Sequence, residues 1–251
     1  MNDSLKLLKV GAEIILDKES HTNRWLVVTD KITHIRHCGE LARTVRPEDD
    51  MLEIAMLWHD IGRVEQFKNI NSFDDMILDH RDLGESFYKR YITTNNIPTS
   101  NETDMIADAI KYHGRPDRCQ STFSKGFVKD VSAIDELENG FYGIMRYLER
   151  EIRNDEKHYR KNNPIADQRI PTNKVWQSYS TCTNFAKDTL ATYADYLLYA
   201  ASLSRTALKR YQYMMPHKDV QNVIEFYHKM FEKYLEQHFA VPSFNLLQKL
   251  N

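Results

Sequence analysis

Apolar residues recur at intervals of three and four positions along almost the whole chain, which is the period of an amphipathic helix. Ile35, Cys38 and Ala42, for example, fall on one helical face. No alternating apolar and polar run predicts a strand. The 251 residues include only 8 Gly and 7 Pro, fewer turn residues than sheets and long loops usually need. The sequence therefore predicts an all-α protein.

The same periodicity gives approximate helix boundaries. Pro47, followed by three acidic residues, predicts a helix start, because proline is tolerated in the first turn and acids favour the N-terminal end of the helix dipole. A polar loop is expected over 69–75, and residues 162–172, with two prolines, are the best linker candidate. The predicted helices span 5–16, 29–42, 47–60, 79–91, 102–112, 126–138 and 146–161, followed by 174–215 with one break and 219–238.

Composition and charge exclude several classes of protein. The net charge is −2, from 34 basic and 36 acidic side chains, so no global basic field is available to hold long nucleic acid. No stretch approaches 18 apolar residues, and the first residues lack the apolar run of a signal peptide, so we expect no membrane span and no secretion. Three cysteines without paired spacing (Cys38, Cys119 and Cys182) favour a reducing compartment, and we expect a cytoplasmic protein.

Six residues with metal-binding side chains occur in a helical or helix-end context. Apolar neighbours, such as Ala55 to Leu57 before the central pair and Val131 and Ile134 before the last residue, predict that they face inward. Imidazole nitrogens and carboxylate oxygens suit manganese, iron, zinc or magnesium, and a helix bundle can gather them in its core. The six are His34, the adjacent His59 and Asp60, then His80, His113 and Asp135.

Three segments resemble the motifs of the HD superfamily of metal-dependent phosphohydrolases. The segment from His34 to Ala42 resembles its opening motif, Ala55 to Arg63 its central motif, and Val131 to Leu137 its final ligand helix. The family often has Arg-Asp-Ala-Asp-Lys at this last place, whereas this chain has Ser132-Ala-Ile-Asp-Glu136. The absent lysine makes the local charge more negative and puts a substrate contact there in doubt.

Further segments are similar to particular HD subgroups. The segments Asp79–Gly84 and Ala109–His113 resemble those that carry the two extra histidines of the two-metal subgroups. The run from Gly62 to Phe67, with Ser72 to Asp74 after it, is similar to a group of bacterial HD proteins of about this length without an agreed substrate. The resemblance implies a helical HD bundle within one domain over 1–251. Its metal-binding core would span about 29–140, and additional C-terminal helices over about 172–240 would pack on that core.

The resemblance also implies the metal ligands. One divalent ion would be held by His34, His59, Asp60 and Asp135, and a second by His80 and His113 with Asp60 bridging. The residues do not distinguish manganese, iron, magnesium, zinc or nickel. Two such ions would activate a hydroxide and clamp a phosphoryl group, which makes Asp60 catalytic.

Two arginines are candidates for contact with the substrate. Arg63, three residues after Asp60, is a candidate catalytic and phosphate-binding residue because a guanidinium offers two parallel donors, although it could instead serve a helix end. Arg115 either binds substrate or lies in a surface loop.

Several residues have an ordinary structural alternative. His80 and His113 could be helix-capping histidines or support other ligands, rather than binding metal themselves. His37, three residues after His34, is predicted to be a partly exposed helix residue, because Cys38 takes the apolar position. Gln66 could contact substrate or a metal-bound water, but it is predicted to lie on a helix surface.

These observations predict a cytoplasmic hydrolase that cleaves a phosphate ester or anhydride of a small nucleotide-like substrate by a metal-activated hydroxide. Alternatives are a dinucleoside polyphosphate hydrolase, a non-catalytic nucleotide-binding HD module and an HD nuclease. The complete set of six ligands argues against the binding module, and the mildly acidic charge argues against the nuclease. The expected partner is a small phosphorylated molecule, with no membrane and no long nucleic acid.

Overall fold

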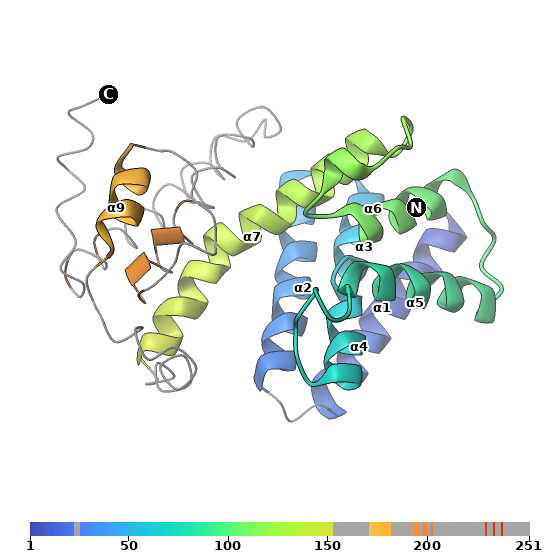
Figure 1. Cartoon of the computed structure of the whole chain (residues 1–251). Coiled ribbons are helices and arrows are strands. Elements are labelled where there is room, and N and C mark those ends of the chain that lie inside the picture. The colour runs from blue at the N-terminus through green and yellow to red at the C-terminus, as the bar shows by residue number, and fades with distance from the viewer. Residues whose placement is uncertain are drawn as a thin grey trace. The chain divides into compact units, whose positions relative to one another are not determined.

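The computed structural model describes residues 1–22, 26–152 and 171–181, with a few single residues between 192 and 237. Within these residues every regular element is a helix and none is a strand, which confirms the all-α prediction (Figure 1). None of the described helices has the length and apolar character that crossing a membrane would require. The chain divides into two compact units, Met1–Glu138 and Asn139–Asn251. The expectation of a single domain over 1–251 stays a prediction.

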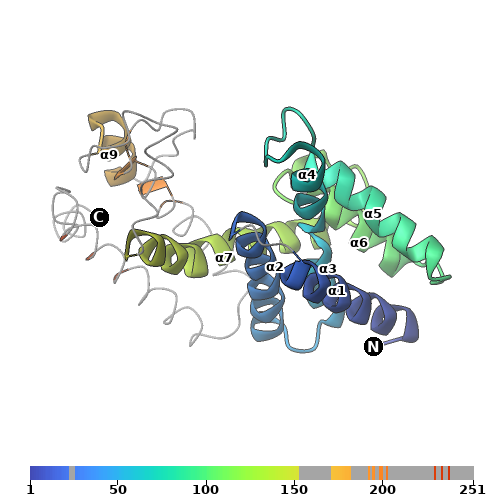
Figure 2. The same cartoon turned by 90° about the horizontal axis from the view of Figure 1, so that it is seen from below.

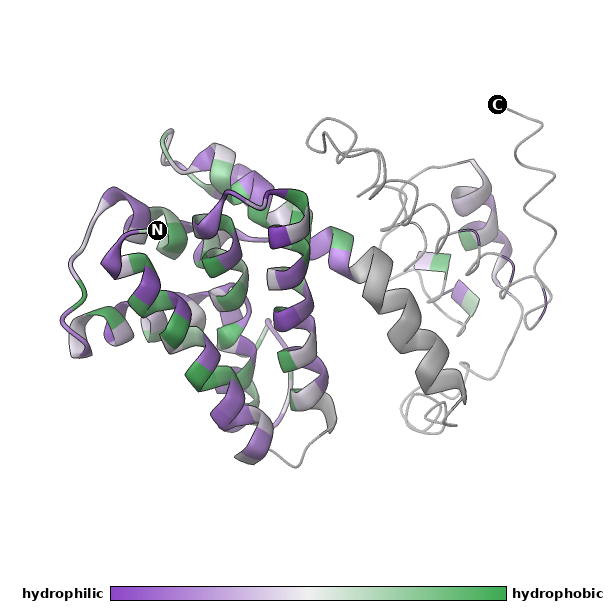
Figure 3. Ribbon diagram, turned by 180° about the vertical axis from the view of Figure 1, so that it is seen from behind, coloured by the Kyte–Doolittle hydropathy of each residue, from purple (hydrophilic) through white to green (hydrophobic). Residues whose placement is uncertain are grey.

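The described residues of the first unit form six complete α-helices and the start of a seventh. Hydrophobic and hydrophilic residues follow one another around each helix at helical spacing (Figure 3). The elements are α1 (Asp3–Thr22), α2 (Leu26–Val45), α3 (Asp50–Trp58), α4 (Ile61–Ile70), α5 (His80–Thr94), α6 (Asn101–Tyr112), a short 3-10 turn (Pro116–Arg118) and α7 (Lys125–Ile152).

Two predicted boundaries near the middle of this unit were wrong. The helix expected to begin near Pro47 begins at Asp50, because the side chain of Asp49 caps it by accepting a hydrogen bond from the Leu52 amide at 3.0 Å. That helix ends at Trp58 rather than Asp60. A further helix, α4, occupies residues 61–70. Its last two residues, 69 and 70, were expected to belong to the polar loop.

Helix α3 forms the centre of the first unit. Every residue from Leu52 to Trp58 is buried, and α3 contacts α1, α2 and α6. The Trp58 indole donates a hydrogen bond to the carbonyl oxygen of Leu8 at 3.0 Å, and its ring packs against Tyr88 and Tyr91 of α5. Trp58 therefore ties α1, α3 and α5 together immediately before the His59-Asp60 pair.

Helices α4 and α5 lie side by side (Figure 2). They approach each other very closely at two glycines. A Cβ atom on Gly62 would lie 1.8 Å from the carbonyl oxygen of His80, and the amide nitrogen of Gly62 is 3.4 Å from the place a Cβ on Gly84 would take. Gly62 lies inside α4 rather than ending a helix. Its missing side chain allows the first residue of α5, His80, to lie beside Asp60.

In the second unit the described residues include α9 (Asn173–Ser180), which has Val175 and Tyr179 buried. Asp195 is fully buried, and its carboxylate accepts hydrogen bonds from the backbone amides of Thr172 (2.7 Å) and Thr192 (3.2 Å). These bonds satisfy a charge that would otherwise be costly to bury. The predicted helix over 146–161 is described only to Ile152. Most of the predicted linker and of the helices over 174–215 and 219–238 lies outside the described residues.

Candidate metal centre

The fold brings all six predicted ligands to one place in the first unit. They come from separate elements that meet around the end of α3. His34 lies in α2, Asp135 in α7, and His59 and Asp60 in the turn between α3 and α4. His80 is the first residue of α5, and His113 directly follows α6. All are buried except Asp135, whose side chain is 20% exposed.

The first group of potential ligands is formed by His34, Cys38, His59 and Asp135, whose ligand atoms all lie within 4.8 Å of one another. The Nε2 atom of His34 is 3.3 Å from Nε2 of His59 and 3.1 Å from Oδ1 of Asp135. Cys38, one turn after His34, places its sulfur 3.8 Å from the same nitrogen. The sequence had treated Cys38 as an apolar core residue, whereas the structure makes its thiol a fourth candidate ligand.

The second group is formed by Asp60, His80 and His113, again within 4.8 Å of one another. The Oδ1 atom of Asp60 is 3.1 Å from Nε2 of His80 and 3.2 Å from Nε2 of His113, and these two nitrogens are 3.1 Å apart. The other carboxylate oxygen of Asp60, Oδ2, is 3.7 Å from Nε2 of His34. The carboxylate of Asp60 thus lies between the two groups, with one oxygen facing each.

All four histidines are oriented in the same way. In each, Nδ1 faces a fixed acceptor, and Nε2 points into the cluster. His59 and His113 donate from Nδ1 to the carbonyl oxygens of Met56 (2.7 Å) and Ile110 (2.8 Å). The other two donate to carboxylates: His34 to Glu138, and His80 to Asp75 at 2.7 Å. This is how metal-binding imidazoles are usually held, because the hydrogen bond fixes the tautomer and leaves Nε2 free to coordinate.

The orientation of the imidazoles tests whether the residues fit a metal. When two neutral imidazoles both carry their proton on Nδ1, their Nε2 lone pairs repel each other at the 3.1 Å that separates those of His80 and His113. The same holds at 3.3 Å for His34 and His59. Only a proton or a cation between the nitrogens removes this repulsion. The donor set therefore fits a metal ion in each group.

The electrostatics of the cluster also favour positive charge inside it. Burial by itself lowers the pKa of His34, but Cys38, Glu138 and Asp135 raise it well above the usual value. For Asp135 the directions are reversed: burial by itself raises the pKa of the carboxyl group, but His34 and His59 lower it to about 2. A buried site that keeps its carboxylates ionised and draws protons onto histidine is one that a divalent cation can occupy instead.

The environment of Asp60 has the same character. Burial would raise the pKa of this carboxyl, but His80, His113 and Lys31 hold it well below its usual range. His59 differs from His34, because burial lowers its pKa to about 4 despite the nearby carboxylates. A neutral His59 already has the protonation state that a metal ligand requires.

Arg63 does not present its guanidinium to open space. Two of its nitrogens contact the two carboxylate oxygens of Asp75, at 2.8 and 3.1 Å, and its side chain is only 16% exposed. Its buried Nε atom has no hydrogen-bond partner in the described part of the chain and lies 3.9 Å from Oδ1 of Asp60. Asp75 in turn accepts a hydrogen bond from Nδ1 of His80, so Arg63 holds the carboxylate that orients the His80 ring.

Gln66 belongs to the same network, which corrects its assignment to the helix surface. It is fully buried, accepts a hydrogen bond from Arg63 at 3.0 Å and donates one to Asp75 at 3.0 Å. Arg115, the second predicted substrate residue, contacts Asp79 at 3.1 Å and Asp82 at 3.9 Å. Its side chain is 23% exposed, so it lies at the edge of the site rather than among the ligands.

Two residues that orient candidate ligands, Glu138 and Asp75, were not predicted from the sequence. Glu138 is fully buried and accepts from Nδ1 of His34, while its other oxygen is 3.4 Å from Nδ1 of His37. Asp75 fixes His80 and was assigned to a polar loop. The only sequence signal for Glu138 was its place one turn after Asp135, on the inward face of the same helix.

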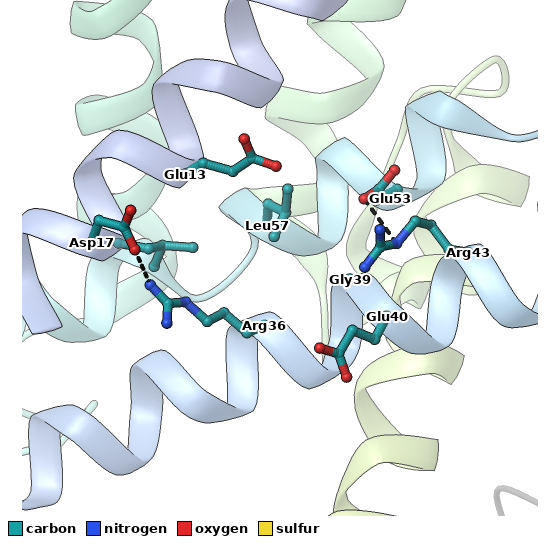
Figure 4. A pocket seen from close by; sticks show the side chains of 9 residues that line it. Glu13, Asp17, Arg36, Gly39, Glu40, Arg43, Glu53 and Leu57 are labelled. Atoms are coloured by element: carbon teal, nitrogen blue, oxygen red, sulfur yellow. Dashed lines mark hydrogen bonds and ion pairs between the residues drawn. The ribbon is translucent and has the colours of Figure 1, made fainter.

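A separate pocket of about 300 Å³ is lined by residues of α1, α2 and α3 (Figure 4). Its residues on α2, such as Arg36 and Arg43, lie opposite His34 around the helix, so this pocket is not the metal centre. Both arginines are paired with acids of the pocket itself, Arg36 with Asp17 and Arg43 with Glu53. The pocket therefore offers no free guanidinium to an anionic ligand.

No protein-family model, curated protein or solved structure matches this chain. The assignment of a function therefore rests on the residues and geometry of the site.

Proposed function

We propose that this protein is a metal-dependent phosphohydrolase that acts on a small nucleotide-like substrate, in keeping with the resemblance of its motifs to the HD superfamily. One observation carries the proposal: the two oxygens of Asp60 face two separate groups of imidazole nitrogens, at 3.7 Å and at 3.1–3.2 Å. A carboxylate shared in this way is what a pair of neighbouring cations needs between them.

In this proposal His34, His59, Asp135 and one oxygen of Asp60 hold the first divalent ion, with the Cys38 thiol within reach. His80, His113 and the other oxygen of Asp60 hold the second. When bound, such a pair of ions supplies an acidified water as nucleophile and offsets the charge on the phosphoryl oxygens. Manganese, iron, magnesium, zinc and nickel all remain candidates, because nitrogen and oxygen donors bind each of them and availability decides the occupant.

The chain's own residues orient the ligands and control access to them. The carboxylates of Glu138 and Asp75 fix the rings of His34 and His80, and the carbonyl oxygens of Met56 and Ile110 fix the other two. Among the six candidate ligands only Asp135 has a partly exposed side chain, at 20%. A substrate therefore reaches the centre from the side of Asp135, while water is excluded from the buried histidines.

The composition favours a small substrate. With a net charge of −2 the chain lacks the basic field that nucleases use to hold a polynucleotide. A dinucleoside polyphosphate hydrolase is the nearest alternative within the same chemistry. A nucleotide-binding module without turnover is an alternative of another class. It has less support, because a module that only binds nucleotide has no need for a carboxylate placed between two groups of histidines.

The proposal is tested by separating and quantifying the hydrolysis products that the manganese-loaded protein forms: phosphate and nucleoside from a monophosphate, and the shorter nucleotides from the other substrates. The panel consists of nucleoside monophosphates, a cyclic nucleotide, a dinucleoside tetraphosphate and single-stranded DNA, with Asp60→Asn as the inactive control. We expect turnover of at least one small nucleotide, absent from the control and from chelator-treated protein. Metal-loaded protein that binds nucleotide but releases no product from any substrate would support the binding module, and cleavage of DNA alone would support the nuclease.

A further inference from the structure

Lys31 is a positively charged residue of α2 that lies beside the candidate metal centre. It lies one turn before His34 on α2, so its side chain leaves the helix on the same side. Its Nζ atom is 3.8 Å from Oδ2 of Asp60, the oxygen that faces the first group of ligands. The side chain is 33% exposed, so it connects the buried cluster with the surface.

The arginines around the centre are already engaged, each with a nearby carboxylate. Arg63 makes a two-point contact with Asp75, at 2.8 and 3.1 Å. Arg81 holds Asp79 in the same manner, at 2.9 and 3.1 Å. Arg115 makes a third contact with Asp79 at 3.1 Å. These guanidiniums stabilise the acidic residues around the second group, and an incoming phosphate would have to displace those acids to reach them.

Lys31 differs from these arginines in two ways. Its 3.8 Å contact with Asp60 is too long for a hydrogen bond, so in the described part of the chain its ammonium donates none. Its partner in this contact, Asp60, is also the carboxylate that would bind both proposed metal ions. Once Asp60 is bound to two cations it no longer offsets the charge of Lys31, and the ammonium is left with three donors and a need for an anion.

We propose that Lys31 binds a phosphoryl oxygen of the substrate and supplies the phosphate-recognition role that the sequence assigned to Arg63. The inference rests on the proposed function, because it presupposes a phosphorylated substrate at the two groups of ligands. Lys31 on α2 and Asp135 on α7 both contact the cluster, and both side chains are partly exposed. In this proposal the substrate enters from the solvent past these two residues. An ammonium on a flexible stem can follow phosphate charge there as a point contact.

The test uses the full-length protein loaded with manganese and inorganic phosphate as the probe. Phosphate affinity is measured by calorimetry for the wild type, Lys31→Gln, Lys31→Arg and the control Lys129→Gln, which removes the same charge from an exposed site on α7. Bound manganese is measured for each protein. Because hydrogen bonds to charged groups are among the stronger ones in proteins, we expect Lys31→Gln to bind phosphate about 10- to 100-fold more weakly. Its manganese content should be unchanged, and Lys31→Arg should recover most of the affinity.

Other results would contradict either the role of Lys31 or the proposed function. A Lys31→Gln protein with wild-type phosphate affinity would overturn the role of Lys31 and leave the phosphohydrolase proposal intact. A Lys31→Gln protein that loses manganese would also overturn it, since Lys31 would then act by positioning Asp60. If the manganese-loaded wild type neither binds phosphate nor turns over any substrate of the panel, the proposed function itself fails.

Discussion

The carbonyl oxygen of His80 occupies the place that a side chain on Gly62 would need, 1.8 Å from the position of its Cβ atom. The contact joins α4 to the start of α5, and it is what brings the His80 ring within 3.1 Å of Asp60. The glycine two residues after Asp60 therefore fixes the distance between the Asp60 carboxylate and the ring of His80.

We expect Gly62→Ala to separate α4 from α5. Since the added methyl group meets backbone atoms that cannot rotate away, the free energy of unfolding should fall by about 1–3 kcal/mol or more. Metal binding at the second group should weaken as well. Gly126→Ala is the matched control, because a Cβ there has nothing within 4 Å, and alanine should leave the stability of α7 equal or slightly higher. Denaturant unfolding of both variants with and without manganese measures the difference. Equal stability of the two variants would contradict the close contact.

Replacement of Asp60 by Asn should remove most metal from both groups and abolish turnover. The amide keeps the shape of the carboxylate but removes the anion that lies between two proposed cations. Asp17→Asn, on α1 and away from the centre, controls for the loss of an acidic residue. Elemental analysis after dialysis reports the metal content. An Asp60→Asn protein that keeps the full metal content and its activity would refute the bridging role.

Arg63→Ala should act on the second metal position rather than on phosphate. Without Arg63 the carboxylate of Asp75 loses its two-point partner, and His80 loses a fixed acceptor for its Nδ1 proton. Changes to residues that orient a metal ligand commonly weaken metal affinity by about 10- to 100-fold, and we expect a loss of this size. Manganese titration measures it against the exposed control Arg118→Ala. If manganese binding is intact and only the phosphate affinity falls, the original assignment of Arg63 to phosphate is the better one.

Glu138→Ala should weaken the first metal position in the same way. Glu138 is fully buried and contacts the Nδ1 atoms of both His34 and His37, so its removal leaves the His34 ring without an anchor. A reduction of about 10- to 100-fold in manganese affinity is expected. Glu40→Ala removes an exposed acid from α2 and serves as the control. Identical manganese affinities in the two variants would show that Glu138 contributes only to folding.

Much of the fold followed from the helical period, but α4, which is separated from α3 by only two residues, did not. The predicted helix ended near Asp60, but Leu57, Ile61 and Val64 continue at helical spacing, so the pattern does not reveal that a second helix begins directly after a turn at His59 and Asp60. This break between the helices is local and depends on turn geometry. It matters for the site, because it turns the carboxylate of Asp60 toward both groups at once.

The predicted ligands could be found because metal-binding residue types stood in apolar surroundings in a recognisable order. Their supporting residues could not. Glu138 acts on a histidine 104 positions away, and Asp75 acts on one only 5 positions away but across a loop whose path the sequence does not define. A polar residue on a helix or in a loop is normally solvated. Nothing in the pattern therefore distinguishes Asp75 from a surface acid, and Glu138 differs from one only by its place on the inward face of its helix.

The metal content of the purified protein tests whether two ions bind, one at each group of ligands. Protein saturated with manganese at neutral pH and freed of excess metal should contain about two equivalents per chain. The double variant His80→Ala with His113→Ala should contain about one, because the first group would remain intact. Wild-type protein that never exceeds one equivalent, with full activity in the double variant, would contradict the account and leave His80 and His113 without a role as metal ligands.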